Sequence, residues 1–243
     1  MKILSFDIGT ANLAYCYVDC IGFVDFNDSN EHIKDHNNIA YNINIIDWDI
    51  INLNEKLTKI CPYALINLFE SKYMHLLDCD IVLIENQPPK NIKMKTIQTI
   101  IHTYFTMIHY KNNKIYINDN IMKTKQNQGK YNEMKRNSVY ICQPRDKYCS
   151  LPPEQRNTYY KRKKMSIQMA TKYLEEICAN SFNNENNDNN NDDDNYCGKI
   201  DDKDEYFIDV NTKYFTQFMD KHKKDDLADS LLQIKVFIEK MVI

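Results

Sequence analysis

Carboxylates gather in one short stretch near the C-terminus, D-D-L-A-D-S-L-L-Q, which begins at Asp225. Its apolar residues recur at helical spacing, so we predict an amphipathic helix that runs to about residue 240. Asp226 and Asp229 are three apart, and Asp225 and Asp229 are four apart, so either pair shares one helix face with side chains about 5–6 Å apart. Acids are also stabilised in a first helical turn by the backbone N–H groups. The cluster is therefore either the capped start of a helix or part of a site for a divalent cation.

Two further acids end apolar runs that are typical of strands. Asp7 follows K-I-L-S-F, and Glu85 ends D-I-V-L-I-E, a continuous apolar run of the kind buried on both faces of a sheet. A carboxylate in that position is costly unless it is paired or bound to a metal. Each acid alone is more simply a turn residue at a strand end, but the three positions together favour a metal site.

Ligation by carboxylates only suits hard cations such as Mg²⁺ or Mn²⁺ rather than zinc. Two such ions a few Å apart can clamp the attacking water and the leaving oxygen of a phosphodiester. The acids therefore predict phosphodiester chemistry, provided that the fold brings them together.

The elements that would position these acids alternate along the chain. Gly9 suits the turn of a tight hairpin that opens the chain. We expect strands over 1–6, 11–18, 43–51, 80–85 and 138–142, and helices over 57–77, 94–110, 161–177, 206–219 and the C-terminal acid stretch. This order predicts an α/β layer fold with a mixed sheet.

The 243 residues suffice for one domain, which we expect to span 1–243. Two segments have the composition of insertions: 111–136 is polar and basic, and 179–205 is a low-complexity tract rich in Asn and Asp that we do not expect to fold. Because its acids would repel phosphates, we expect the second segment to loop away from any nucleic acid.

Charge is unevenly distributed, although the net charge is only −3. Residues 90–172 hold 18 Lys and Arg against 4 Asp and Glu. This asymmetry favours a basic surface for a polyanion beside an acidic site or tail.

The eight cysteines form no C-x-x-C motif, and Cys16 and Cys20 fall in a strand-like apolar run where buried thiols are expected. No signal peptide is evident, so we expect an intracellular, reducing location. No run approaches 18 apolar residues, so we expect no membrane association through a spanning helix.

Three motifs together resemble a known family. The strand Asp of K-I-L-S-F-D-I-G-T, the strand Glu of I-V-L-I-E-N-Q-P and the helix acids of D-D-L-A-D-S-L-L-Q resemble the RuvC-type Holliday junction resolvases, and most of all their poxvirus and large-DNA-virus branch. The run Y-K-R-K-K-M-S at 160–166 is similar to the lysine-rich helix of that branch. Each motif is short, but they occur in the family's order from Met1 to Gln233.

The resemblance implies a ribonuclease H-like fold, in which a mixed five-stranded sheet is flanked by helices. It implies a homodimer that makes paired, symmetric, Mg²⁺-dependent nicks in four-way DNA junctions and leaves 5′-phosphates, in DNA recombination and repair or in resolving replicated viral genomes. If the viral likeness holds, the protein would act at a viral replication site in the host cytoplasm.

Carried over residue by residue, the resemblance implies two Mg²⁺ ions, replaceable by Mn²⁺, held by Asp7, Glu85, Asp226 and Asp229. The helix motif of the family has two acids three apart, which selects Asp226 and Asp229 and leaves Asp225 as a cap or a supporting residue. Gln87 either orients a water or substrate or makes a hydrogen bond that ends the strand.

Basic residues near these motifs are candidate DNA contacts, although a solvated helix face would have the same composition. The candidates are Lys161, Arg162, Lys163, Lys164 and Lys224.

Three rival functions deserve comparison. An actin-like phosphotransferase also has a D-I-G-T phosphate loop, but it needs further Gly-rich loops, and the chain has only four glycines. A DNA-binding module without catalysis would be expected to lack the acids. Other ribonuclease H-like nucleases, which cut RNA–DNA hybrids or flaps, share the acids and remain an alternative.

Overall fold

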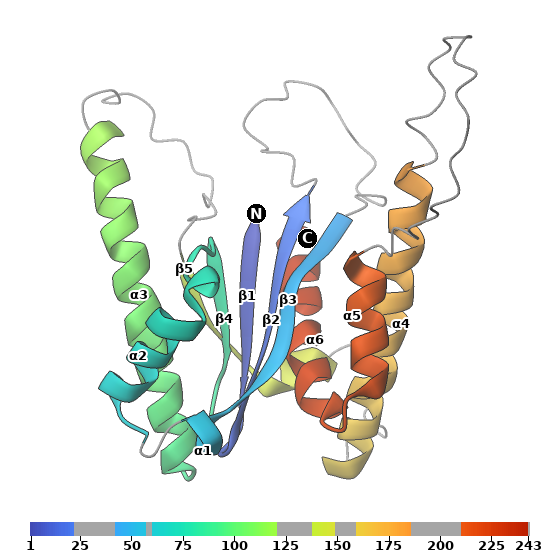
Figure 1. Ribbon diagram of the computed structural model, residues 1–243, viewed down its shortest axis with the longest axis horizontal. Helices are drawn as coiled ribbons and strands as arrows, with labels where there is room; N and C mark the ends of the chain where they lie inside the picture. The colour runs from blue at the N-terminus through green and yellow to red at the C-terminus, as the bar shows by residue number, and fades with distance from the viewer. Residues whose placement is uncertain (22–41, 57–59, 121–137, 149–158, 186–209, 243) are drawn as a thin grey trace, which may run out of the picture.

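A mixed five-stranded sheet forms the centre of the computed structural model, which describes residues 1–21, 42–56, 60–120, 138–148, 159–185 and 210–242 (Figure 1). The strands are β1 (Lys2–Ile8), β2 (Asn12–Ile21), β3 (Asn42–Asn52), β4 (Ile81–Glu85) and β5 (Ser138–Cys142). Their order across the sheet is β3-β2-β1-β4-β5. β2 is antiparallel to both β1 and β3, whereas β4 and β5 run parallel to β1. The predicted five-stranded mixed sheet is confirmed.

The turn between β1 and β2 depends on Gly9. Its N–H donates to the carbonyl oxygen of Asn12 over 2.8 Å. A Cβ atom at Gly9 would stand 2.8 Å from that same oxygen, closer than carbon and oxygen tolerate. The only glycine of this region therefore allows the close backbone approach that reverses the chain directly after Asp7.

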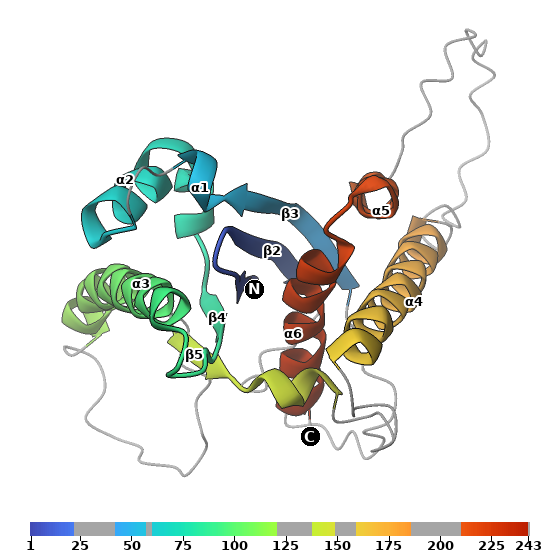
Figure 2. The same cartoon turned by 90° about the horizontal axis from the view of Figure 1, so that it is seen from below.

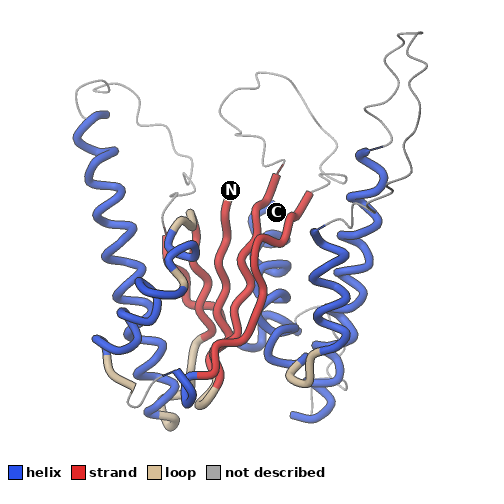
Figure 3. The backbone as a smooth tube through the Cα atoms, in the orientation of Figure 1, coloured by secondary structure: helices blue, strands red, loops and turns tan. Residues whose placement is uncertain are grey.

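Helices cover both faces of the sheet, so the molecule has three layers (Figures 1 and 3). One face carries α2 (Pro62–Lys72), the 3₁₀ turn η1 (Met74–Leu77) and α3 (Ile92–Asn120), with the short α1 (Leu53–Lys56) at its edge. Their apolar residues pack on Leu4, Phe6 and Ile84 of the sheet. Phe6 contacts both Phe69 of α2 and Phe105 of α3, with ring centroids 5.8 and 5.7 Å apart.

The opposite face carries α4 (Tyr159–Glu185), α5 (Val210–Asp220) and α6 (Lys224–Val242). These helices bury the residues of alternate strand positions, including Ile3, Leu83 and Trp48. The Asn211 side chain of α5 accepts a hydrogen bond from the Ile45 N–H and donates to the Ile43 carbonyl. The edge of β3 is thereby partly covered, which reduces its exposure to other chains.

The alternation of side chains along the two central strands decides which way the acids point. In β1, Leu4 and Phe6 face α2 and α3, so Ser5 and Asp7 face α6. In β4, Ile84 faces α3, which turns Glu85 towards α6. Because Phe6 and Ile84 are partners in the parallel ladder, Asp7 and Glu85 follow at the same level. Both carboxylates therefore project from the same end of the sheet, at the ends of β1 and β4, towards α6.

Helix α6 is fixed against β1 by a buried glutamine. Ser5 donates its hydroxyl to Gln233 Oε1 over 3.2 Å, and Gln233 Nε2 donates to the carbonyl of Phe6 over 3.4 Å. Both side chains are almost fully buried. Asp229 precedes Gln233 by four residues, so it lies on the same face one turn closer to the strand ends.

Several predicted boundaries need correction. The single helix expected over 57–77 is divided into α1, α2 and η1, and residues 57–59 lie outside the described chain. Helix α3 extends to Asn120 and α4 extends to Glu185, so each enters a segment that we expected to be an insertion. The remainders of those segments, 121–136 and 186–205, lie outside the described residues.

The six cysteines within the described residues are free thiols, and Cys16 and Cys20 are buried in β2 as expected. Of the helices described here, none is both long and apolar enough to cross a membrane.

Replacing Gln233 by Leu should destabilise the protein by about 1–3 kcal/mol, because the Ser5 hydroxyl would remain buried without its acceptor. Urea unfolding would measure this loss. The same change at Gln217, an exposed residue of α5, is the matched control and should alter stability by less than about 0.5 kcal/mol. Equal effects at both positions would contradict the role given to Gln233.

Candidate active site

Three of the predicted acids surround one buried ammonium group. Lys147 belongs to η2 (Pro144–Tyr148), the 3₁₀ turn that follows β5. Its Nζ lies 3.7 Å from Asp7 Oδ1, 3.1 Å from Glu85 Oε1 and 3.3 Å from Asp229 Oδ2. These side chains come from β1, β4 and α6, and the turn beside α6 in Figure 2 adds the lysine.

The lysine is held by charge rather than by a single directed bond. Its side chain is only 2% exposed, and none of the described groups is aligned to accept a hydrogen bond from its ammonium. Burial alone would favour the neutral amine, but the charges of Asp229, Asp7 and Glu85 outweigh burial and raise the pKa of Lys147. Lys147 is therefore a permanent cation among three carboxyl groups.

Asp7 and Glu85 are both enclosed, but their pKa values shift in opposite directions. Burial raises the pKa of Asp7 well above its usual range, and the neighbouring Glu85 raises it further. Burial opposes ionisation of Glu85 too, but the charge of Lys147 and hydrogen bonds from Asp7 and Gln87 prevail and lower its pKa. Asp7 is therefore the more readily protonated of the two acids, and Glu85 is the more readily ionised.

Both oxygens of Asp229 contact consecutive residues of η2. Lys147 lies near Oδ2, and the hydroxyl of Tyr148 donates to Oδ1 over 3.4 Å. The same hydroxyl is 2.8 Å from Ser166 Oγ on α4. Burial and the charge of Asp229 raise the pKa of Tyr148 to about 12, so the phenol keeps its proton at neutral pH.

The two acids that open α6 differ in their partners. Asp225 lies inside the first turn of α6 rather than before it, and it forms an ion pair with Lys163 of α4 instead of capping the helix. Burial disfavours its charge, but Lys163 outweighs that effect and lowers its pKa.

Asp226 does not join the cluster around Lys147: within the described chain, that ammonium has ion pairs with Asp7, Glu85 and Asp229 alone. Burial and the charge of Asp225 raise the pKa of Asp226. Seven residues separate Asp226 from Gln233, which corresponds to a difference of only about 20° around the helix axis. Asp226 therefore projects to the side of α6 that faces β1, one turn beyond Asp229.

Gln87 is hydrogen-bonded to Glu85 at the end of β4. Its side chain is almost fully buried and donates to both Glu85 Oε2 and the Glu85 carbonyl, each over 3.3 Å. The Gln87 N–H donates to Gln98 Oε1, which also accepts from Lys95 Nζ over 3.0 Å. A polar chain thus connects Glu85 to the start of α3.

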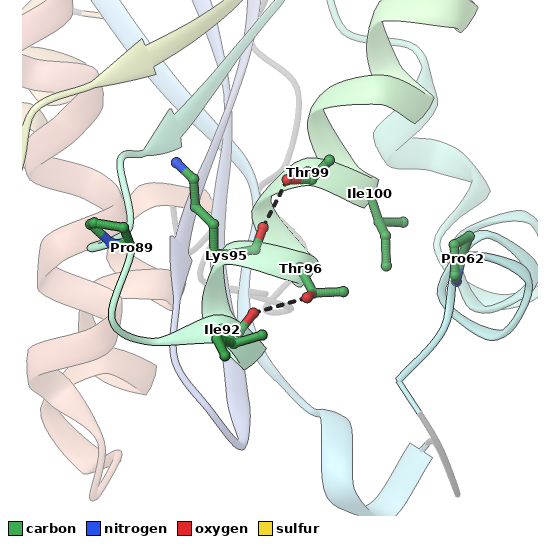
Figure 4. Close-up of a pocket in the computed structure, with 7 residues that line it drawn as sticks. All are labelled: Pro62, Pro89, Ile92, Lys95, Thr96, Thr99 and Ile100. Atoms are coloured by element: carbon green, nitrogen blue, oxygen red, sulfur yellow. Dashed lines mark hydrogen bonds between the residues drawn. The ribbon is translucent and has the colours of Figure 1, made fainter.

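Lys95 lies at the end of that chain, where it lines a shallow groove of about 380 Å³ between the starts of α2 and α3. Figure 4 shows the other residues around it, which are Pro62, Pro89, Ile92, Thr96, Thr99 and Ile100. The polar chain therefore ends at an open, largely apolar surface.

The predicted DNA contacts lie mostly at the start of α4. Lys161, Arg162 and Lys164 are exposed there, whereas Lys163 is half-buried against Asp225 with its Nζ 5.0 Å from the centre of the Tyr159 ring. Lys224 begins α6. The starts of α3, α4 and α6 all lie at the end of the sheet where β1 and β4 terminate (Figure 1). Helix starts carry partial positive charge, so this end combines basic side chains with three favourable dipoles.

Lys147 and Tyr148 are the residues that sequence reasoning missed. Both residues belong to the run Q-P-R-D-K-Y, which directly follows a predicted strand, just as Asp7 and Glu85 stand at the ends of predicted strands. That parallel was the available signal, but Lys147 is one of 18 basic residues in its region and no periodicity distinguishes it.

The donor set fits a divalent metal chemically. As the side chains stand, no three Asp, Glu, His or Cys residues in the described chain are arranged to hold one ion. The ammonium of Lys147 nevertheless shows that a cation is stabilised between Asp7, Glu85 and Asp229. The oxygens of these residues are the ligands that Mg²⁺ and Mn²⁺ prefer.

The strand order and the parallel pairing of β1 with β4 place acids at the ends of two adjacent central strands. No protein-family model and no curated protein sequence matches the chain.

Solved structures to which the chain is similar include three Holliday junction resolvases. The fowlpox virus resolvase in complex with Holliday junction DNA is 17% identical, covers 100% of both chains and has a TM-score of 0.49. The yeast mitochondrial resolvase Ydc2 is 14% identical over 98% of this chain and 83% of its own, with a TM-score of 0.42. RuvC of Thermus thermophilus is 8% identical over 100% and 98%, with a TM-score of 0.44.

In the metal-free protein, Asp7→Asn should increase stability at neutral pH by about 1–2 kcal/mol, because Asn mimics the protonated form that burial favours. A raised folded pKa means that Asp7 costs stability as the pH rises. The gain should therefore be absent near pH 4 and grow until the pH passes the raised pKa of Asp7.

Thermal unfolding in EDTA across this pH range would test the expectation. Asp49→Asn is the control, since Asp49 is half-exposed and pairs with Lys221 on the surface. A gain for Asp7→Asn that does not depend on pH would contradict the raised pKa of Asp7.

Proposed function

We propose that this protein is a Mg²⁺-dependent endonuclease that resolves four-way DNA junctions. The observation that carries the proposal is the convergence of Asp7, Glu85 and Asp229 on one cation. The basic starts of α3 and α4 at the same end of the molecule provide further support. These acids are also the ones that the resemblance to RuvC-type resolvases selects, with Asp226 as the fourth.

The four acids would hold two divalent ions, with Asp229 and Glu85 nearest the present position of the ammonium. Bound there, the ions would activate a water and stabilise the leaving oxygen, which yields a 5′-phosphate and a 3′-hydroxyl. Gln87 keeps Glu85 oriented through its hydrogen bond to Oε2. Lys147 supplies a cation that neutralises the acids before metal binds.

The DNA backbone would cross the end of the sheet between the starts of α3 and α4. Lys161, Arg162 and Lys164 are exposed, and Lys224 at the start of α6 is half-buried; we assign phosphate contacts to these four residues. Lys163 is committed to Asp225, so we assign it to holding α4 against α6 rather than to a free phosphate contact. Because backbone contacts release counterions, binding should weaken steeply with salt.

Paired symmetric nicks require two active sites. We therefore propose that the protein acts as a homodimer, which would place two such sites on the symmetric arms of one junction. The principal alternative is a ribonuclease H-like nuclease of another specificity, since hybrid or flap cleavage would use the same four acids. Only the substrate distinguishes these functions.

Purified protein should nick a four-way junction in Mg²⁺ at two symmetric positions, and it should cut linear duplex and RNA–DNA hybrid far more slowly. End-labelled substrates in Mg²⁺ and in EDTA would measure this. Glu85→Gln should reduce cleavage by a factor on the order of 10² or more, the effect of removing one group that stabilises a transition state. Equal cutting of all three substrates would disprove junction selectivity while leaving nuclease activity.

Asp226→Asn and Asp225→Asn form a matched pair that tests the choice of ligand on α6. Asp226→Asn should reduce junction cleavage by on the order of 10² or more, as expected for a metal ligand. Asp225→Asn breaks the pair with Lys163 and should retain most of the cleavage at saturating Mg²⁺. The reverse order of activities would show that Asp225 is the ligand.

A further inference from the structure

Asp229 is the least enclosed of the three acids around Lys147, with 22% of its side chain exposed against 12% for Asp7 and 14% for Glu85. Helix α6 fixes its Cβ atom but not the plane of its carboxyl group, which can rotate about χ2. A partly exposed carboxylate that rotates freely makes a poor metal ligand, because fixing its orientation costs conformational entropy when the metal binds. Some other contact must therefore orient it.

The hydroxyl of Tyr148 makes such a contact. A carboxylate can only accept hydrogen bonds, so the Tyr148 hydroxyl must donate its proton to Asp229 Oδ1. The bond between Tyr148 and Ser166 must then run the other way, with the Ser166 hydroxyl donating to the tyrosine oxygen over 2.8 Å. The result is a directed chain from Ser166 through Tyr148 to Asp229.

This chain is built into the core rather than lying on the surface. Ser166 is fully buried on α4, and Tyr148 is 9% exposed. The turn that carries Tyr148 is also fixed to α6 at its other side, where Lys240 pairs with Asp146 over 2.8 Å. Three elements, η2, α4 and α6, thus define where the phenol oxygen lies.

The two contacts of Asp229 differ in what happens when a divalent cation arrives. Lys147 lies near Oδ2, and its positive charge competes with a metal for that oxygen. Tyr148 is neutral and contacts Oδ1, so its hydrogen bond is compatible with a metal on Oδ2. Such bonds are often long before a ligand binds and shorten afterwards.

We infer that Tyr148 and Ser166 are positioning residues that orient the Asp229 carboxylate for metal binding, Tyr148 directly and Ser166 through Tyr148. This inference rests on the proposed metal-dependent nuclease function. It assigns to the two hydroxyl groups no contact with DNA and no transfer of a proton.

The test compares wild type with Tyr148→Phe, which removes only the hydroxyl. Calorimetric titration of the metal-free protein with Mn²⁺, without DNA, should show an affinity reduced on the order of 10-fold, the lower end of the cost of losing a partner of a metal ligand. In junction cleavage, the Mg²⁺ concentration for half-maximal rate should rise by a similar factor, while the rate at saturating Mg²⁺ changes little.

Ser166→Ala provides the second variant. It should weaken Mn²⁺ binding in the same direction but less, and adding it to Tyr148→Phe should have no further effect, because Ser166 acts only through the lost hydroxyl. Additive losses would contradict the directed chain.

Tyr15→Phe is the matched control. The Tyr15 hydroxyl is also mostly buried and donates to a carboxylate, Asp47 Oδ2 over 2.7 Å, but it lies outside the candidate site. Its loss should lower the melting temperature without changing Mn²⁺ affinity. If Tyr15→Phe lost as much Mn²⁺ affinity as Tyr148→Phe, the effect of Tyr148→Phe would be explained by general destabilisation. That result would overturn the inference.

The two proposals fail in different ways. If wild type binds Mn²⁺ and nicks junctions but Tyr148→Phe has an unchanged metal requirement, the inference alone is wrong. If wild type neither binds Mn²⁺ nor nicks DNA, the proposed function is wrong and the inference falls with it.

Discussion

The ion pairs of Lys147 are the interaction on which this end of the molecule depends. Asp7, Glu85 and Asp229 come from three elements and would repel one another across the gap between sheet and helix. One ammonium, buried among them, allows the strands and α6 to close. The arrangement still carries more acid than base, and burial together with the neighbouring Glu85 raises the pKa of Asp7. Such uncompensated charge is costly for folding, and it is also what makes the site attractive to a divalent ion.

The geometry behind this cluster follows from two simple periodicities. Side chains alternate along a strand, so burial of Phe6 against α3 turns Asp7 towards α6, and burial of Ile84 does the same for Glu85. On α6, a spacing of four places Asp229 one turn beyond Gln233, whose amide is bonded to β1. The core thus aims the acids, and a slip of one residue in either strand would turn its carboxylate to the opposite face.

These periodicities explain which parts of the site were predictable from sequence. Asp7 and Glu85 were identified because each ends an apolar run, and the five-stranded mixed sheet followed from the order of such runs. Lys147 was not identified, because it lies in a short 3₁₀ turn without a period and among many other lysines. The partner of Asp225 was also inaccessible, since its pairing with Lys163 joins residues 62 apart in the chain. The ends of α3 and α4 were underestimated because polar composition does not by itself end a helix.

The single tryptophan of the chain gives this fold an optical property. Trp48 stacks on Phe218 of α5, with ring centroids 5.0 Å apart, and its indole N–H donates to the Leu227 carbonyl and to Ser230 Oγ on α6. Leu227 and Ser230 are the direct chain neighbours of Asp226 and Asp229, respectively. The emission of one indole therefore senses the backbone that carries these two acids. A movement of the first turns of α6 would therefore change the fluorescence of Trp48, and no added label is needed to detect it.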